Sequence, residues 1–146
     1  MYEPGEDLAA DELKRIDHLI FVTLKYTRTV DIIRTILQKF ILAIDYKVEQ
    51  YYGIKLEEKK IDKIPLLPLM RIRDLEKRHK KDSKVKDMVD FYVSLKRTCN
   101  AEYRPREEYR KNVTLVTKED EVNIAHLKEY AELVKEYIEL VGNLEK

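Results

Sequence analysis

Cysteine, glycine and proline are scarce in this chain of 146 residues, which contains one, three and four of them respectively. The single Cys99 excludes an intramolecular disulfide and any metal site built on paired thiols. The glycines stand at positions 5, 53 and 142, so the chain has no glycine-rich loop of the kind that cradles phosphate. Nucleotide hydrolysis by a P-loop is therefore excluded.

Long apolar runs are also missing. The longest, Phe40 to Ile44, has five residues, whereas a membrane span needs about twenty. The first residues, Met1 to Asp7, are acidic and have neither the basic leader nor the apolar run of a signal peptide. We therefore expect a cytoplasmic protein without a membrane segment.

Charge, in contrast, is abundant. Charged residues make up 39% of the chain and hydrophobic residues 44%, enough apolar material for a core within a single domain over residues 1–146. Lys and Glu dominate the charge, a bias typical of heat-adapted proteins in which ion-pair networks replace thermolabile side chains. The composition thus predicts a thermophilic source.

The net charge is only +1, but its distribution is uneven. Residues 71–86 contain eight Lys or Arg against three Asp or Glu, whereas residues 118–146 contain four against eight. The interpretation we favour is that these segments neutralise one another within the fold or across a dimer. The alternative is that the basic segment binds an external polyanion.

The segment from Thr29 to Tyr52 has no glycine or proline and predicts a long central helix that ends at Gly53. Its apolar residues recur at three- and four-residue steps, which places them on one helical face. Such a helix is about 36 Å long, so we expect the other elements to pack along it. The apolar positions are Val30, Ile33, Leu37, Phe40, Ile41, Ile44, Val48 and Tyr51.

The same periodicity predicts helices from Asp7 to about Thr27, from Pro68, from Asp82 or Ser83, and from Asn123. No glycine or proline enforces a turn between Thr27 and Thr29. The first helix is therefore either separate and antiparallel to the central one, which we favour, or continuous with it over about 45 residues.

Two short segments, Val113 to Thr117 and Glu121 to Ile124, have β-branched residues in alternation and a polar turn between them. They form either a small hairpin that lies against the helices or a plain loop, because an isolated two-stranded ribbon is only marginally stable. The fold predicted for the whole chain is all-α: a bundle of four or five helices with a small hairpin before the last helix.

The basic segment contains the most suggestive motif. Arg73, the polar Asp74 and His79 six positions after Arg73 resemble the Arg-x4–6-His motif of HEPN domains, all-α modules some of which cleave RNA without a metal. The resemblance implies that His79 moves a proton and Arg73 holds a phosphate, the two converging in a cleft that is often shared by two subunits. Six positions on an unbroken helix separate two side chains by about 120°, so a helix end must intervene.

The alternative interpretation of this motif is a solvated, basic helix end whose cations complement the helix dipole, and the flanking Lys and Arg residues favour it. The segment also offers cations for nucleic-acid phosphates. No aromatic residue lies between Arg71 and Lys86, so we expect binding without base readout. The candidate cations are Lys77, Arg78, Lys80, Lys81, Lys84 and Lys86.

A second cluster lies in residues 103–112, where tyrosines and arginines interleave in a way that suits base stacking or a phosphate clamp. The alternative, which we favour, is that Glu107 and Glu108 pair with these arginines on an exposed helix. The pocket candidates are Tyr103, Arg104, Arg106, Tyr109 and Arg110.

We expect neither a metal nor a cofactor, because the only Glu-x-x-His spacing, Glu76 to His79, cannot alone form a di-metal site. Ten tyrosines are many for a small surface, and tyrosine is favoured at interfaces, so we expect a homodimer. The predicted function is a non-enzymatic interaction module that binds a second copy, another protein or RNA. The alternative is a HEPN-like domain that binds nucleic acid or cleaves RNA without a metal.

Overall fold

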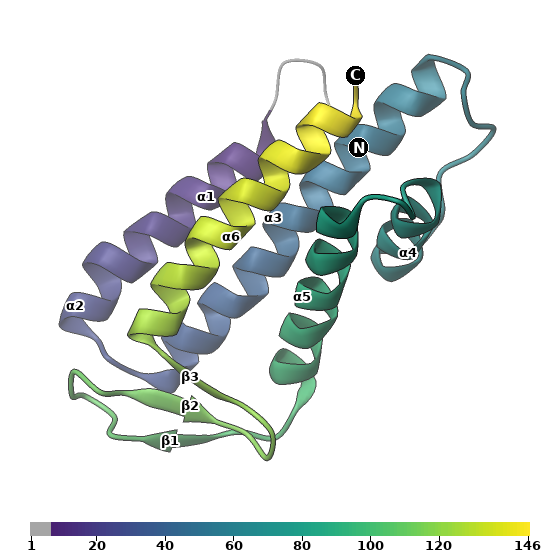
Figure 1. Cartoon of the computed structure of the whole chain (residues 1–146). Helices are drawn as coiled ribbons and strands as arrows, with labels where there is room; N and C mark the ends of the chain where they lie inside the picture. The colour runs from purple at the N-terminus through teal and green to yellow at the C-terminus, as the bar shows by residue number, and fades with distance from the viewer. Residues whose placement is uncertain (1–6) are drawn as a thin grey trace.

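The computed structural model describes residues 7–146 and is mainly helical, with a small antiparallel sheet at one end (Figure 1). The acidic residues 1–6, on which the expectation of a missing signal peptide rests, lie outside the described part of the chain. The helical elements are α1 (Leu8–His18), a π-helical turn (Leu19–Thr23), α2 (Leu24–Tyr26), α3 (Val30–Glu57), α4 (Pro68–Arg78), α5 (Ser83–Asn100) and α6 (Ile124–Leu144). The strands are β1 (Arg104–Arg106), β2 (Thr114–Val116) and β3 (Glu121–Asn123).

The first helical run and α3 are separate and antiparallel, which settles the alternative that the sequence left open (Figure 1). The run begins at the predicted cap, where the Asp7 carboxylate accepts a hydrogen bond from the Ala10 N–H at 2.9 Å. It ends at Tyr26, because Thr27 has an extended backbone, and the Thr29 hydroxyl then caps α3. Threonine caps therefore make the turn without glycine or proline.

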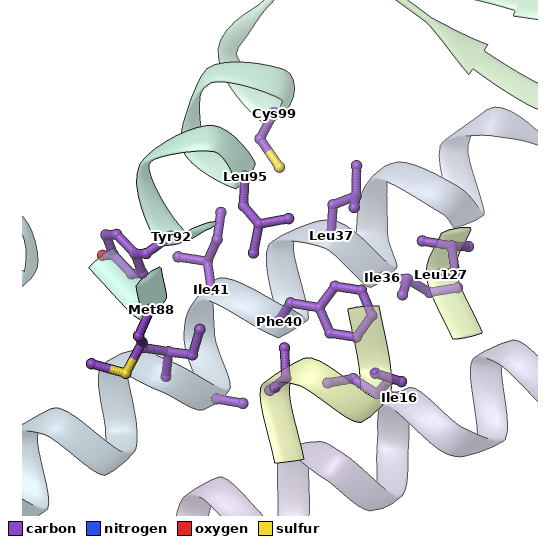
Figure 2. Close-up of a cluster of buried hydrophobic side chains, with 14 of the residues drawn as sticks. Ile16, Ile36, Leu37, Phe40, Ile41, Met88, Tyr92, Leu95, Cys99 and Leu127 are labelled. Carbon is purple, nitrogen blue, oxygen red and sulfur yellow. The ribbon is translucent and has the colours of Figure 1, made fainter. Parts of the chain in front are cut away.

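Helix α3 is the central helix of the fold and contacts α1, α4, α5 and α6. All eight apolar positions predicted to face the core are buried. Figure 2 shows Phe40 of α3 among side chains from the surrounding helices, including Ile16 of α1, Leu95 of α5 and Leu127 of α6. The helical class predicted from the periodicity is thus confirmed.

The prediction that Gly53 ends the central helix is wrong, because α3 continues to Glu57. A glycine inside a helix costs only about 1 kcal/mol, and here the helix gains the buried Lys55 beyond it. The Lys55 ammonium group donates to the carbonyl of Glu145 at 3.2 Å and so ties this last turn to the end of α6. The chain leaves the helix at Lys59, which has a positive φ of 61°.

Helices α4 and α5 begin where the sequence predicts, at Pro68 and after the cap Asp82. The helical period of α4 predicts Leu69 on the same inward face as Ile72 and Leu75, but only Ile72 and Leu75 are buried and Leu69 is 47% exposed. The reason is that α4 lies at the edge of the molecule, so only a narrow stripe of its surface is covered (Figure 1).

The predicted hairpin is confirmed: β2 and β3 pair antiparallel, with the buried Leu115 opposite the buried Val122. Sequence analysis missed β1, which pairs with the other edge of β2. The exposed helix that we favoured within residues 103–112 does not form, because Glu107 and Tyr109 have positive φ values of 58° and 68° and the chain turns there. A third strand and contacts with α3 and α6 stabilise a ribbon that would be marginal alone.

A polar pair lies within the helical packing. The Tyr92 hydroxyl of α5 donates a hydrogen bond of 2.6 Å to the Asp45 carboxylate of α3. Burial raises the pKa of Asp45 above its ordinary value, although Tyr92, Lys96 and Arg71 oppose this. The ionised carboxylate is therefore less stable in the folded chain than in water.

We expect Asp45→Asn to raise the melting temperature at pH 7 and to have little effect at pH 3. A carboxyl group whose pKa is raised by folding stabilises the fold below its unfolded pKa of 3.8, and this contribution is lost as the pH rises through the folded value. Asparagine retains an acceptor for Tyr92 without the charge. Thermal unfolding followed by circular dichroism at both pH values measures the effect.

The matched control is Glu129→Gln, which removes an exposed carboxylate of α6. A melting temperature of Asp45→Asn below that of the wild type at pH 7 would contradict the prediction.

Candidate functional site

The basic segment covers the last turns of α4, the connection to α5 and the first turn of α5. Helix α4 ends at Arg78, and His79 takes its C-cap position, so the required helix end does separate Arg73 from His79. Lys77 and Arg78 occupy the last turn, where cations complement the helix dipole.

Asp74 and Arg78 are engaged with each other and with α3. The Asp74 carboxylate accepts hydrogen bonds from the Tyr52 hydroxyl at 2.5 Å and from Arg78 Nε at 2.7 Å. The Arg78 guanidinium also lies over the Tyr52 ring, 5.8 Å from its centre. Burial raises the pKa of Asp74, but the bonds from Tyr52 and Arg78 outweigh it and hold the pKa below its ordinary value. This cluster fastens α4 to α3.

His79 contacts the same turn of α3. Its Nε2 atom lies 3.1 Å from the Tyr51 hydroxyl, and the two rings meet edge to face. Burial lowers the pKa of His79, and the nearby cations Lys55 and Arg78 lower it further, whereas Asp82 raises it. The imidazole is therefore neutral at pH 7 and is able to accept a proton.

Arg73 lies on the outer side of α4, where its guanidinium is 3.6 Å from the Glu76 carboxylate. It lines an open hollow together with Leu69 and Met70, whereas His79 lines a different hollow among the lysines of the connection. Within one chain, the two motif residues thus have separate partners and line different hollows, which share Lys77.

The candidate cations for nucleic acid fall into two groups. Arg78 and Lys86 pair with Asp74 and Asp90 at 2.7 and 3.0 Å. The other four are exposed and have no carboxylate within 4.0 Å among residues 7–146. Ion pairs within the fold therefore leave a positive surface at the end of α4, made by Lys77, Lys80 and Lys81, whereas Lys84 lies in the first turn of α5.

The second predicted cluster has a structural role at the start of α3. The Tyr103 hydroxyl donates to the Asp31 carboxylate at 3.0 Å, and the Arg34 guanidinium lies 5.7 Å from the centre of the Tyr103 ring. The Glu108 carboxylate accepts from the Val30 N–H at 2.9 Å and thereby caps α3 from a distant part of the chain.

The five pocket candidates of that cluster are not gathered in one place. Tyr103 and Arg104 line a shallow hollow with Lys118, but the other three do not. Arg106 pairs with Glu121 at 2.6 Å across the sheet. The remaining two candidates are exposed in the turn after β1 and are Tyr109 and Arg110.

Sequence analysis missed the most exposed apolar feature at this end of the molecule. Four large apolar side chains at the start of α4 have exposed fractions between 47% and 80%. We call them the apolar ridge; they are Leu66, Leu67, Leu69 and Met70. A signal was present in the sequence, because residues 65–70 combine four large apolar side chains with two prolines, and no helical stripe can bury such a segment completely.

Arg71 holds the apolar ridge in place. Its Nε and terminal nitrogen donate to the carbonyl oxygens of Pro65 and Leu66 at 2.8 and 2.9 Å. The loop before α4 is thus fixed by two charge-assisted hydrogen bonds, which are about twice as strong as neutral ones. This fixed backbone holds Leu66 and Leu67 in their exposed positions.

Other reactive residues have structural explanations. Cys99 is buried, and burial raises the pKa of its thiol. His126 accepts from the Asn123 N–H through Nδ1 in the capping box of α6, as expected of a structural histidine. No cluster of three or more potential metal ligands occurs within residues 7–146. No helix in the described part of the chain is long and apolar enough to cross a bilayer.

Comparison with known proteins adds no relative: no family model, curated protein or solved structure matches the chain.

We expect Asp82→Asn to lower the pKa of His79 further. Asparagine caps a helix as well as aspartate does, so α5 keeps its N-terminus while the charge that raises the His79 pKa disappears. Titration of the His79 ring protons by NMR measures the change. The control is Asp90→Asn, which removes a carboxylate from an exposed position of α5. An unchanged or higher His79 pKa in Asp82→Asn would contradict this electrostatic description.

Proposed function

We propose that the chain is a non-enzymatic interaction module that uses the apolar ridge to bind a second copy of itself. The observation that carries the proposal is the fixed exposure of four neighbouring large apolar side chains, Leu66, Leu67, Leu69 and Met70. Single exposed apolar residues are ordinary on a protein surface, whereas a contiguous group of them is characteristic of a binding site.

The geometry of the ridge supports binding, because the surface is organised before a partner arrives. Arg71 already orders the backbone of Pro65 and Leu66 through two hydrogen bonds. Association therefore does not have to order this loop, and less of the interaction energy is lost to conformational entropy.

A second copy is the partner that the rest of the surface supports. Among the described residues, Lys77, Lys80 and Lys81 at the end of α4 have no carboxylate within 4.0 Å, and Glu136 and Glu139 on α6 are exposed without a cation partner. Two copies supply both the cations and the carboxylates that such pairing needs.

We expect the wild type to scatter light as a dimer and the variant Leu66→Ser with Leu69→Ser to be a monomer at the same concentration. Each buried leucine contributes about 1.5–3 kcal/mol, so each substitution should weaken the dimer at least about tenfold. Size-exclusion chromatography with light scattering over a dilution series measures the dissociation constant.

The matched control for these leucines is Tyr26→Ser, because Tyr26 is 79% exposed and Leu66 is 80% exposed. Tyr26 ends α2, far from the ridge in the sequence, and its loss should leave the dimer intact. A wild type that stays monomeric at high concentration would overturn the proposal, as would a double variant that remains dimeric.

A second candidate function, RNA binding, is favoured by the exposed lysines beside His79. Lys80 and Lys81 line the same open hollow as His79, and neither has a carboxylate partner within residues 7–146. Cleavage of the HEPN kind would in addition need Arg73 beside His79. One chain keeps these two residues in different hollows, so a second chain would have to supply one of them.

For this candidate we expect Lys80→Gln with Lys81→Gln to weaken the binding of a single-stranded RNA and to reduce the slope of log K against log salt by about 1.4. Each phosphate contact on a single strand contributes about 0.7 to that slope. Fluorescence anisotropy at several salt concentrations measures both quantities, and the change to glutamine preserves side-chain length.

The control is Lys111→Gln with Lys118→Gln, which removes two exposed lysines near the sheet. Cleavage is tested separately with Arg73→Ala and His79→Ala. A wild type that does not bind RNA would exclude RNA binding. A wild type that does not cleave RNA, or alanine variants with unchanged turnover, would exclude cleavage by Arg73 and His79.

A further inference from the structure

An open groove lies between the first turns of α5 and the last turns of α6. It has a volume of about 590 Å³, and the half-buried side chains of Leu133, Tyr137 and Leu140 line it. All three come from α6, so the groove presents an apolar strip along one helix. The packing of α5 against α6 produces this groove.

Carboxylates dominate the rim of the groove. Asp87, Glu136 and Glu139 line it, with Lys84 as the single cation among the lining residues. Within the described chain none of the three carboxylates has a Lys or Arg nitrogen within 4.0 Å. Burial raises the pKa of Tyr137, and the charges of Asp87 and Glu136 raise it further, so the groove is negative.

The apolar ridge has flanking charges of the opposite sign. Arg73 and Lys77 line the hollow formed with Leu69 and Met70, and they lie one helical turn apart on α4; Arg73 is exposed and 3.6 Å from Glu76, whereas Lys77 has no carboxylate within 4.0 Å among the described residues. Asp74 lines the same hollow, but its carboxylate is already bound by Tyr52 and Arg78. The ridge thus combines exposed leucines with cations, and the groove combines an apolar strip with carboxylates.

Resting on the proposed self-association, we infer that the ridge of one copy docks in the α5–α6 groove of a second copy. The leucines of the ridge contact Leu133 and Leu140 of the partner subunit, and its cations face the carboxylates of the rim. Figure 1 shows α4 and α6 on opposite sides of α5, so a chain cannot place its ridge in its own groove.

A two-fold axis closes this contact into a dimer. Each chain has both a ridge and a groove, so one copy inserts its ridge into the partner and receives the partner's ridge in return. The same contact therefore occurs twice, and any charge change in the ridge or the groove affects both occurrences.

This double occurrence permits a charge-swap experiment. The ridge variant is Arg73→Glu with Lys77→Glu, and the groove variant is Glu136→Lys with Glu139→Lys. Alone, each variant brings like charges together at both contacts, so we expect its self-association to weaken at least about tenfold. Mixed in equal amounts, the two variants form a dimer with one chain of each, because both of its contacts then join opposite charges.

The measurement is native mass spectrometry, with light scattering on the same samples. A small mass tag on the groove variant distinguishes the mixed dimer from either homodimer. Higher salt should weaken the mixed dimer, because the contacts at the rim are solvent-exposed. Circular dichroism confirms that each variant is folded; if a double variant unfolds, the single changes Lys77→Glu and Glu139→Lys replace it.

The control for the groove variant is Glu102→Lys with Glu129→Lys, which makes the same change in net charge as that variant but nearer the sheet. We expect it to dimerise like the wild type. The docking in the groove would be overturned if the ridge variant and the groove variant each dimerise normally alone, or if they remain monomers when mixed. This holds even if Leu66→Ser with Leu69→Ser still disrupts the dimer. A monomeric wild type would instead overturn the self-association on which the inference rests.

Discussion

The burial of α3 is the constraint on which the rest of the fold depends. At 28 residues this helix is about 42 Å long, so a single element reaches both ends of the molecule. Its middle turns hold the apolar core around Phe40 between α1, α5 and α6 (Figure 2). The same buried cluster includes Val30 at the start of the helix and Tyr52 near its end, and at both ends polar contacts with distant parts of the chain complete the structure.

The two ends of α3 are completed differently, and this difference explains where exposed apolar surface remains. At the start, Glu108 caps the Val30 N–H and the sheet covers the end. Near the other end, Tyr51 and Tyr52 hold α4 through the buried Ile72 and Leu75 and through polar contacts, with Asp74 bonded to Tyr52 at 2.5 Å. Because α4 is attached at its later turns, its first turn and the preceding loop are left without cover, which exposes the apolar ridge.

The sequence was sufficient where a local rule decides the structure. Helical periodicity identified the buried face of α3, and side-chain caps located the starts of α1 and α5 at Asp7 and Asp82. The sequence was insufficient where a contact with a distant part of the chain decides the local structure. Gly53 looked like a stop, yet contacts of Lys55 with α6 extend the helix past it. Glu108 looked like part of a charged helix, and only the folded chain places it at Val30.

The two candidate functions make opposite demands on Arg73. In the proposed docked dimer Arg73 would face carboxylates of the partner subunit, which would neutralise its charge. For RNA cleavage Arg73 would have to hold a phosphate near a neutral His79, and carboxylates at that position would repel the phosphate. An arginine cannot satisfy both requirements in one arrangement. The surroundings of Arg73 in the proposed assembly would therefore distinguish an interaction surface from a nuclease site, and in the single chain Arg73 and His79 line different hollows.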